Sequence, residues 1–328
     1  MNREHKCLAL FSGGLDSILA VKHMEKLGYT VIPVFFETPF FEATPALKAA
    51  QSNGIDLQVI NVMPEYLHVL KNPRYGYGKN MNPCVDCHGF MFRKAAEMMK
   101  EYGADFLISG EVLGQRPKSQ RKDAMNAVAK LSGVKDLLVR PLCQRFLSDP
   151  LPIRAGWVDK EELLDIQGRG RYRQIELARE YDVKEFQTPA GGCKLTDIKY
   201  SRKLKDLLEH DQINDYNIKF LNYGRHFRLN ENTRLVVGRN MAENEHLSLM
   251  TSDELVVKAV DYHGPLGIIC KDSDIDDTEI EMAARIVLRY NNKVDGESDV
   301  GWGKNFALNN IIKVEKYTPE EVEELMIK

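Results

Sequence analysis

The chain has 328 residues, 43% of them hydrophobic and 28% charged, and a formal net charge of -3 at pH 7. This length exceeds what one hydrophobic core usually supports and the composition is that of an ordinary folded protein, so we expect two domains. The charge excludes a globally polybasic protein, and the lack of a secretory signal or of any apolar stretch near the roughly 20 residues of a membrane span predicts a cytoplasmic protein without membrane contact.

The N-terminal part alternates between strand and helix signals. We predict strands at residues 6–11, 30–36, 55–61 and 105–108, and helices at residues 15–27, 43–53 and 86–102. Near-continuous apolar strands that alternate with helices indicate a parallel sheet covered by helices on both faces. Ligands of such sheets bind at the carboxyl ends of the strands.

The loop at residues 12–17 (SGGLDS) lies between the first strand and the first helix. Gly13 and Gly14 let backbone amides approach a pyrophosphate, and the helix N-terminus favours an anion there. Ser12 and Ser17 add hydroxyl donors, and Asp16 is a candidate ligand of the Mg²⁺ that accompanies ATP. An ordinary Gly-Gly turn is the alternative. The segment resembles the SGGxDS signature of the PP-loop ATP pyrophosphatases, which cleave ATP to a substrate adenylate and pyrophosphate.

Three of the six cysteines are candidates for metal ligation or catalysis. Cys84 and Cys87 lie at the start of the helix expected from residue 86, where the helix dipole favours thiolates. Cys193 follows two glycines that allow a close approach of the backbone. Cys7, Cys143 and Cys270 have apolar, strand-like surroundings and are predicted to be buried. A cytoplasmic location makes disulfides unexpected.

Three thiolates suit a 4Fe-4S cluster on Cys84, Cys87 and Cys193, because the cluster has four irons and one of them would stay open. An open iron could hold an exogenous hydrosulfide as a nucleophile. Two alternatives remain: a structural zinc site closed by His88, and a metal-free persulfide relay that uses Cys193 and one thiol of the pair.

Residues 109–120 follow the strand predicted at 105–108, so Glu111, Gln115 and Arg116 could line the nucleotide or base pocket. A plain surface loop is the alternative. After about residue 205, short strand signals and a helix near residues 280–288 indicate a separate α+β unit. We place the boundary in a polar stretch, which gives domains of residues 1–209 and 210–328.

Four segments in this order, namely residues 12–17, 82–87, 109–120 and 191–193, resemble the tRNA-thiolating PP-loop enzymes of the 4-thiouridine synthase and 2-thiouridylase type. The resemblance implies an adenine nucleotide alpha hydrolase-like fold, followed here by the smaller α+β domain. It also implies that ATP adenylates a uracil carbonyl of tRNA, that sulfur attacks the activated carbon, and that AMP departs. Sulfide or a cysteine desulfurase would supply the sulfur.

The C-terminal domain resembles the RNA-binding domain of the NFACT ribosome-associated proteins at residues 237–247 and 263–265. Phosphate contacts there could come from Arg225, Arg228, Arg234 and Arg239. Two further basic patches, which are also typical of a solvated surface, comprise Arg116, Lys118, Arg121 and Lys122, and Arg169, Arg171 and Arg173.

Other interpretations of the whole chain stay open. A PP-loop amidotransferase or ligase would use an amine nucleophile and leave the cysteines without a role, and a small molecule could replace tRNA as the substrate. A non-catalytic RNA-binding factor would hold ATP only as a structural ligand. A sulfonucleotide reductase is not favoured, because the last 58 residues contain no cysteine. The sequence indicates no oligomeric state.

Overall fold

The computed structural model describes residues 4–116, 119–187, 193–271 and 274–328. The chain divides into two compact units, Met1–Lys194 and Leu195–Lys328, which we call the first and second units. The division assigns helix α8 (Ile198–Glu209) to the second unit, whereas the boundary predicted at residues 209/210 assigns it to the first. Helix α8 buries its apolar face, and its Asp206 forms an ion pair with Arg228 of strand β6 (Arg225–Arg228), which explains this grouping.

The first unit contains the predicted parallel sheet. Its strands are β1 (Lys6–Leu10), β2 (Thr30–Glu37), β3 (Gln58–Asn61), β4 (Phe106–Ser109) and β5 (Leu138–Val139), in the spatial order β3-β2-β1-β4-β5. All four pairings are parallel. The chain changes direction across the sheet between β1 and β4, and the carboxyl ends of strands at such a switch point are where ligands bind.

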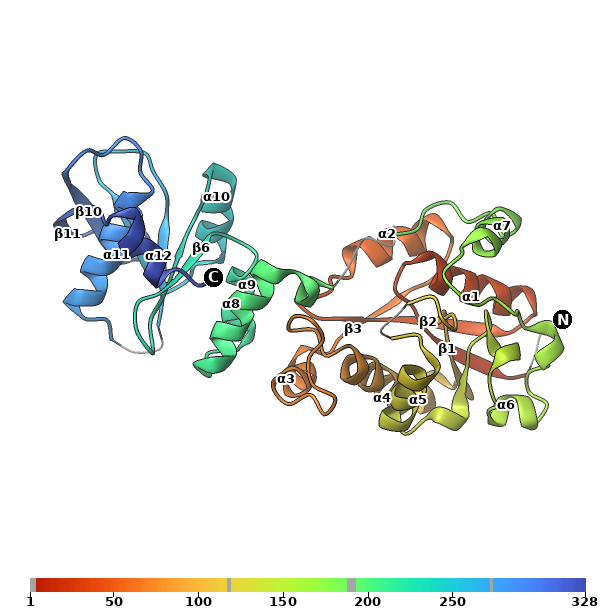
Figure 1. The fold of residues 1–328 in the computed structure, drawn as a ribbon. Coiled ribbons are helices and arrows are strands. Elements are labelled where there is room, and N and C mark those ends of the chain that lie inside the picture. Colours follow the sequence, from red (N-terminus) through yellow and green to blue (C-terminus); the bar gives the residue numbers. More distant parts are fainter. Residues whose placement is uncertain (1–3, 117–118, 188–192, 272–273) are drawn as a thin grey trace. The chain divides into compact units, whose positions relative to one another are not determined.

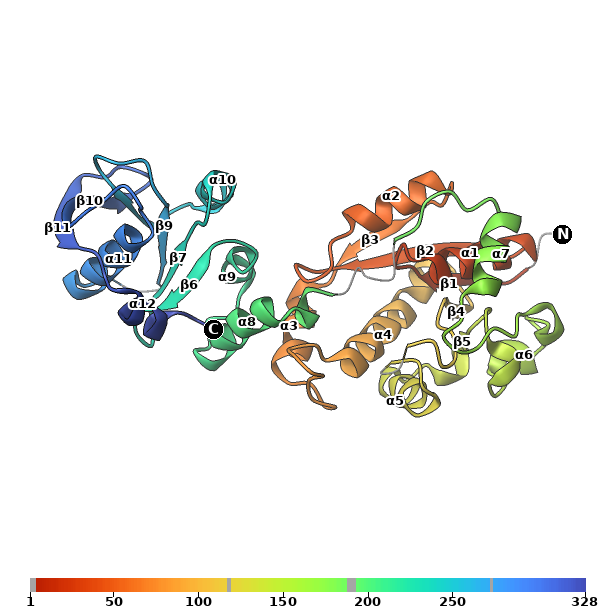
Figure 2. The ribbon, with the colours of Figure 1, turned by 45° about the horizontal axis from the view of Figure 1, so that its top comes forward.

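Helices cover both faces of this sheet, as predicted (Figures 1 and 2). Helices α1 (Leu15–Lys26) and α2 (Thr44–Ser52) lie on one face, and α4 (Cys84–Tyr102) and α5 (Lys122–Ser132) lie on the other. The remaining helices of the unit are α3 (Met63–Lys71), α6 (Leu151–Arg154) and α7 (Tyr172–Glu180). Apolar strand residues such as Cys7, Ala9, Phe106 and Ile108 pack against Ile18 and Val21 of α1 in a continuous core.

The second unit is built on an antiparallel sheet in the order β11-β10-β8-β9-β7-β6. Besides β6, its strands are β7 (Arg234–Val237), β8 (Leu255–Ala259), β9 (Gly267–Cys270), β10 (Glu297–Lys304) and β11 (Asn310–Glu315). Helix α11 (Asp277–Arg289) packs on one face of the sheet, while α9 (Asp215–Phe220) and α10 (Met241–Met250) contribute to the apolar cluster on the other. Helix α12 (Pro319–Leu325) follows β11. The α+β class predicted for this part is confirmed.

None of the helices in the described part of the chain is long and apolar enough to cross a membrane.

Candidate active site

The loop of residues 12–17 joins the carboxyl end of β1 to α1 at the switch point of the sheet. The Ser17 hydroxyl donates to the Gly14 carbonyl oxygen (2.8 Å) and accepts from the Ser12 backbone N–H (3.2 Å), so it closes the loop. Ser17 is buried and has this structural role in place of the predicted donation to a ligand, while Ser12 is exposed. Gly13 has a φ of +74°, and a Cβ there would lie 2.8 Å from Ala46 Cα, so only glycine fits.

Two residues that the sequence analysis missed hold this loop from outside. Gln187 donates its backbone N–H to the Gly13 carbonyl (2.9 Å) and its Nε2 to the Ser12 carbonyl (3.0 Å). Gly110, directly after β4, packs its Cα against α1, and a Cβ there would lie 2.5 Å from the Asp16 carbonyl oxygen. The glycine between Ser109 and Glu111 is visible in the sequence, but nothing local reveals that Gln187 reaches this loop.

Asp16 lies in the first turn of α1, and its carboxylate contacts residues from two other segments. Its Oδ2 accepts a hydrogen bond from Gln115 Nε2 (2.5 Å) and lies 3.8 Å from Arg171 Nη2. Burial raises the pKa of Asp16, while Arg171, Gln115 and Arg116 act against the rise. The structure therefore brings together Asp16, Gln115 and Arg116, which the sequence analysis named as candidates.

Glu111 does not line an open nucleotide pocket, which corrects the prediction. The residue is 6% exposed, and its Oε2 lies 2.8 Å from Arg140 Nε while its Oε1 lies 3.4 Å from His88 Nδ1. Burial raises the pKa of Glu111, but Arg140 and His88 outweigh burial and lower it to about 2. Its carboxylate is thus engaged in a buried charged network that connects β4 to helix α4.

This network predicts a large effect on stability. Replacing Arg140 by alanine leaves Glu111 as a buried, uncompensated charge, which typically costs about 3–5 kcal/mol. We expect a loss of that size in the free energy of unfolding, measured by urea denaturation. The Glu111 contribution to wild-type stability should be complete above pH 4.5, the ordinary pKa of glutamate, and should fall as the pH drops towards about 2.

The matched control is Arg154→Ala. Arg154 forms an exposed ion pair with Asp136 (2.7 Å), and such pairs contribute only about 0–1 kcal/mol. Equal losses in the two variants would contradict the buried-pair interpretation.

The two cysteines of α4 differ in environment. Cys84 is the first residue of the helix and its Sγ lies 3.1 Å from Nδ2 of the buried Asn82. Burial raises the pKa of Cys87 to about 12, and the neighbouring Cys193 and Cys84 thiols add to the rise. Burial therefore favours the protonated thiol at Cys87, whereas the sequence analysis expects a thiolate from its place at the helix start.

The Tyr66 hydroxyl lies near all three candidate cysteines. It is buried beside the Cys87 thiol. Burial raises the pKa of Tyr66, and the Cys87, Cys193 and Cys84 thiols raise it further, so all three lie near it. Within the described ranges, no three His, Cys, Asp or Glu side chains form a group that could hold a metal ion. Gly191 and Gly192, which the prediction placed before Cys193, lie outside the described residues. Cys7, Cys143 and Cys270 are buried as predicted.

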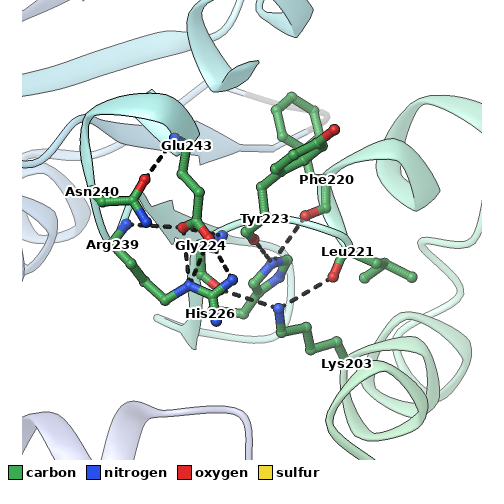
Figure 3. A network of polar contacts seen from close by, with 9 residues as sticks. All are labelled: Lys203, Phe220, Leu221, Tyr223, Gly224, His226, Arg239, Asn240 and Glu243. Carbon is green, nitrogen blue, oxygen red and sulfur yellow. Dashed lines mark hydrogen bonds and ion pairs between the residues drawn. The ribbon is translucent and has the colours of Figure 1, made fainter. Parts of the chain in front are cut away.

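In the second unit, the four arginines proposed as phosphate contacts already have intramolecular partners. Arg234 is only 1% exposed, so the prediction that it reaches a phosphate is wrong. Arg239 pairs with Glu243, which also accepts from the Gly224 backbone N–H (Figure 3). Arg228 pairs with Asp206, and Arg225 lies over the Tyr290 ring at 4.2 Å. In the same network, Lys203 donates to the carbonyls of Leu221 (3.2 Å) and Gly224 (3.1 Å) (Figure 3).

The basic patches of the first unit are also partly paired. Arg121 lies 3.2 Å from Asp123, and Arg173 lies 3.2 Å from Glu176. Lys118 lies outside the described residues.

Comparison with family models gives one match for each unit. Residues 3–145 match the family described as thiamine biosynthesis protein (ThiI), and residues 224–326 match the NFACT protein RNA binding domain. The first unit thus resembles the ThiI family and the second resembles the NFACT RNA-binding domain, which confirms the predicted resemblance.

Curated relatives that match part of this chain are named as tRNA-modifying enzymes. The chain is 32% identical over 130 residues to a tRNA-specific 2-thiouridylase MnmA of Petrotoga mobilis, which covers 33% of this chain and 35% of that protein. It is 32% identical over 199 residues to a probable tRNA sulfurtransferase of Methanosarcina acetivorans, which covers 57% of this chain and 40% of the relative. The chain therefore spans well under half the length of either relative.

Among solved structures, the chain is similar to a 4-thiouridine synthetase in complex with RNA and bound ATP. The two are 20% identical with a TM-score of 0.34, over 55% of this chain and 52% of that one.

Proposed function

We infer that this protein is an ATP-dependent sulfurtransferase that thiolates uridine in tRNA. The observation that carries the proposal is that Cys84, Cys87 and Cys193 all lie near Tyr66, in the unit that holds the 12–17 loop. The Lys194 backbone N–H donates to the Phe40 carbonyl (3.3 Å), just after β2, so Cys193 lies at the carboxyl edge of the sheet. The 12–17 loop follows the neighbouring strand β1 at the same edge.

The proposed chemistry uses the 12–17 loop and the cysteines in turn. A carbonyl oxygen is a poor leaving group, so the base oxygen first bonds to the α-phosphorus of ATP and pyrophosphate leaves. The base gives up its ring N–H proton to solvent in this step. A sulfur nucleophile then adds to the activated carbon, and AMP departs with the former carbonyl oxygen. The names of the thiouridylase and sulfurtransferase relatives and the NFACT-type domain support tRNA as the substrate.

Site residues are proposed on the same basis. Ser12, Gly13, Gly14 and Ser17 form the loop for ATP, and Asp16 is the candidate ligand of Mg²⁺. Gln115 and Arg116 lie beside Asp16 and would bind the nucleotide together with it. Glu111 would support the site indirectly, through its buried ion pair with Arg140.

We propose a 4Fe-4S cluster on Cys84, Cys87 and Cys193, whose binding would have to draw together three thiols that form no metal-binding group in the described part of the chain. The buried Tyr66 hydroxyl, which lies beside the Cys87 thiol, would suit a hydrogen bond to a cluster or ligand sulfur. When bound, the cluster would supply an iron without a protein ligand, to which external sulfide could bind. Sulfide or a cysteine desulfurase is the proposed sulfur source, and the cytoplasm is the proposed location.

The decisive experiment combines metal analysis with a thiolation assay. Protein purified without oxygen is analysed for iron and acid-labile sulfide, then incubated with tRNA, ATP, Mg²⁺ and sulfide. We expect about four irons per chain and thionucleoside formed together with AMP and pyrophosphate. Thiolation without iron would support the persulfide relay. Pyrophosphate release that requires ammonia and no sulfur would replace the proposal with an amidotransferase, and salt-sensitive tRNA binding without pyrophosphate release would indicate a non-catalytic factor.

A further inference from the structure

Three buried polar atoms without hydrogen-bond partners lie in one network of the first unit. They are Asp16 Oδ1, Arg171 Nε and Gln174 Oε1. Gln115 links two of these side chains, because its Nε2 donates to Asp16 Oδ2 (2.5 Å) and its Oε1 accepts from Gln174 Nε2 (2.7 Å). Arg171 joins the network through its Nη2, which lies 3.8 Å from Asp16 Oδ2. Buried polar atoms almost always have partners, so three unsatisfied atoms in one network indicate a ligand site.

The fold brings Arg171 to this network from a distant part of the sequence. The Gly168 backbone N–H donates to the Leu113 carbonyl (2.8 Å), which ties the residues before α7 to the loop that follows β4. Leu177 and Ala178 of α7 share an apolar cluster with α1. Arg171, directly before α7, therefore lies beside the first turn of α1, with its side chain 26% exposed and its Nη2 3.8 Å from Asp16 Oδ2.

Charge indicates what the ligand is. A phosphate loop that also carries the Asp16 carboxylate needs cations to accept the negative triphosphate of ATP. The planar guanidinium of arginine suits two phosphate oxygens at once. Within this cluster Arg171 is the guanidinium nearest to Asp16, and one of its nitrogens is buried without a partner.

We propose that Arg171 binds the β- and γ-phosphates of ATP and neutralises the leaving pyrophosphate, and that Gln174 is a positioning residue for Gln115 and Asp16. The proposal rests on the proposed function. When the base oxygen bonds to the α-phosphorus, the bond from the α-phosphorus to the bridging oxygen breaks and its electron pair stays on pyrophosphate. Arg171 would lie where this charge develops.

The neighbouring arginines supply matched controls. Arg169, Arg171 and Arg173 alternate in the sequence, but Arg169 and Arg173 are exposed and Arg173 already pairs with Glu176 (3.2 Å). The alternation predicts only a basic patch, whereas the structure separates one inward arginine from two outward ones.

The test is calorimetric titration of the full chain with ATP, pyrophosphate and AMP in the presence of Mg²⁺. Arg171→Ala should weaken ATP and pyrophosphate binding at least about tenfold and leave AMP binding unchanged, since hydrogen bonds to charged groups are the stronger ones. Arg171→Lys should recover part of the loss, because lysine restores the charge but not the two-pronged hydrogen bonding of a guanidinium. Arg173→Ala should bind all three ligands like the wild type.

Unchanged ATP affinity in an Arg171→Ala protein with the wild-type melting temperature would overturn the proposal. An equal loss of AMP affinity would overturn the assignment to pyrophosphate. A wild-type protein that bound no ATP would instead contradict the proposed function itself.

Discussion

Replacing Cys193 by alanine is expected to abolish tRNA thiolation, by at least about 10³-fold, while ATP binding stays at the wild-type level. Cys193 shares the surroundings of Tyr66 with Cys84 and Cys87, whereas the ATP loop is closed by Ser17 and Gln187, which the substitution leaves untouched. Thionucleosides are quantified by mass spectrometry after digestion of the tRNA. Iron content, measured in parallel, should fall from about four per chain to a small fraction of that value.

Cys7→Ala is the control for this variant. Cys7 is a fully buried thiol in β1 that packs in the sheet core, so its loss should lower stability slightly and leave both iron and thiolation intact. Full thiolation by the Cys193→Ala protein would remove Cys193 from the mechanism. Normal iron with lost thiolation would assign Cys193 to sulfur transfer and not to cluster binding.

Replacing Asp16 by asparagine should reduce ATP-dependent pyrophosphate release at least about 100-fold and at the same time stabilise the free protein. Burial raises the pKa of Asp16, so the ionised carboxylate is less favourable in the folded protein than in the unfolded chain. An acid with a raised pKa lowers stability as the pH rises above its ordinary pKa, and the loss is complete above the raised pKa. Asparagine removes this cost. Activity and melting temperature are therefore expected to move in opposite directions.

Pyrophosphate release and thermal unfolding of the same preparations check both effects. Asp123→Asn is the control, because Asp123 is an exposed residue in an ordinary ion pair with Arg121 (3.2 Å) and should affect neither quantity measurably. A lower melting temperature for Asp16→Asn would show that the hydrogen bond from Gln115 outweighs the burial of charge. Undiminished pyrophosphate release would remove Asp16 from the magnesium site.

The local patterns of the sequence predict much of this fold. The apolar run at residues 6–11 and the glycines after it predict β1, the loop and α1, and the observed β1 (Lys6–Leu10) and α1 (Leu15–Lys26) agree. The helix predicted near residues 280–288 lies within α11 (Asp277–Arg289). Helix α3 (Met63–Lys71) is not predicted, although its Tyr66 lies among the cysteines, because a short helix beside a polar loop lacks a clear period.

Long-range partners are the part that the sequence does not reveal. The sequence places Glu111 in a loop that could line a pocket, but in the structure its carboxylate pairs with Arg140 and His88. The arginines at residues 169–173 are equivalent in the sequence, but only Arg171 points inward. Gln187 contacts the 12–17 loop although the two are 175 residues apart in the sequence. These contacts depend on tertiary packing, which is why spacing alone does not show them.

The attachment of Gln187 to the 12–17 loop limits the distance between that loop and Cys193. Cys193 follows Gln187 by six residues, and a chain of that length extends at most about 20 Å. The 12–17 loop and Cys193 are therefore held within about that distance of one another. Under the proposed function, a base adenylated at the loop would meet a nucleophile at Cys193 without leaving the enzyme. The labile adenylate would then react before it could dissociate. This advantage would come from the short chain segment that joins the two sites.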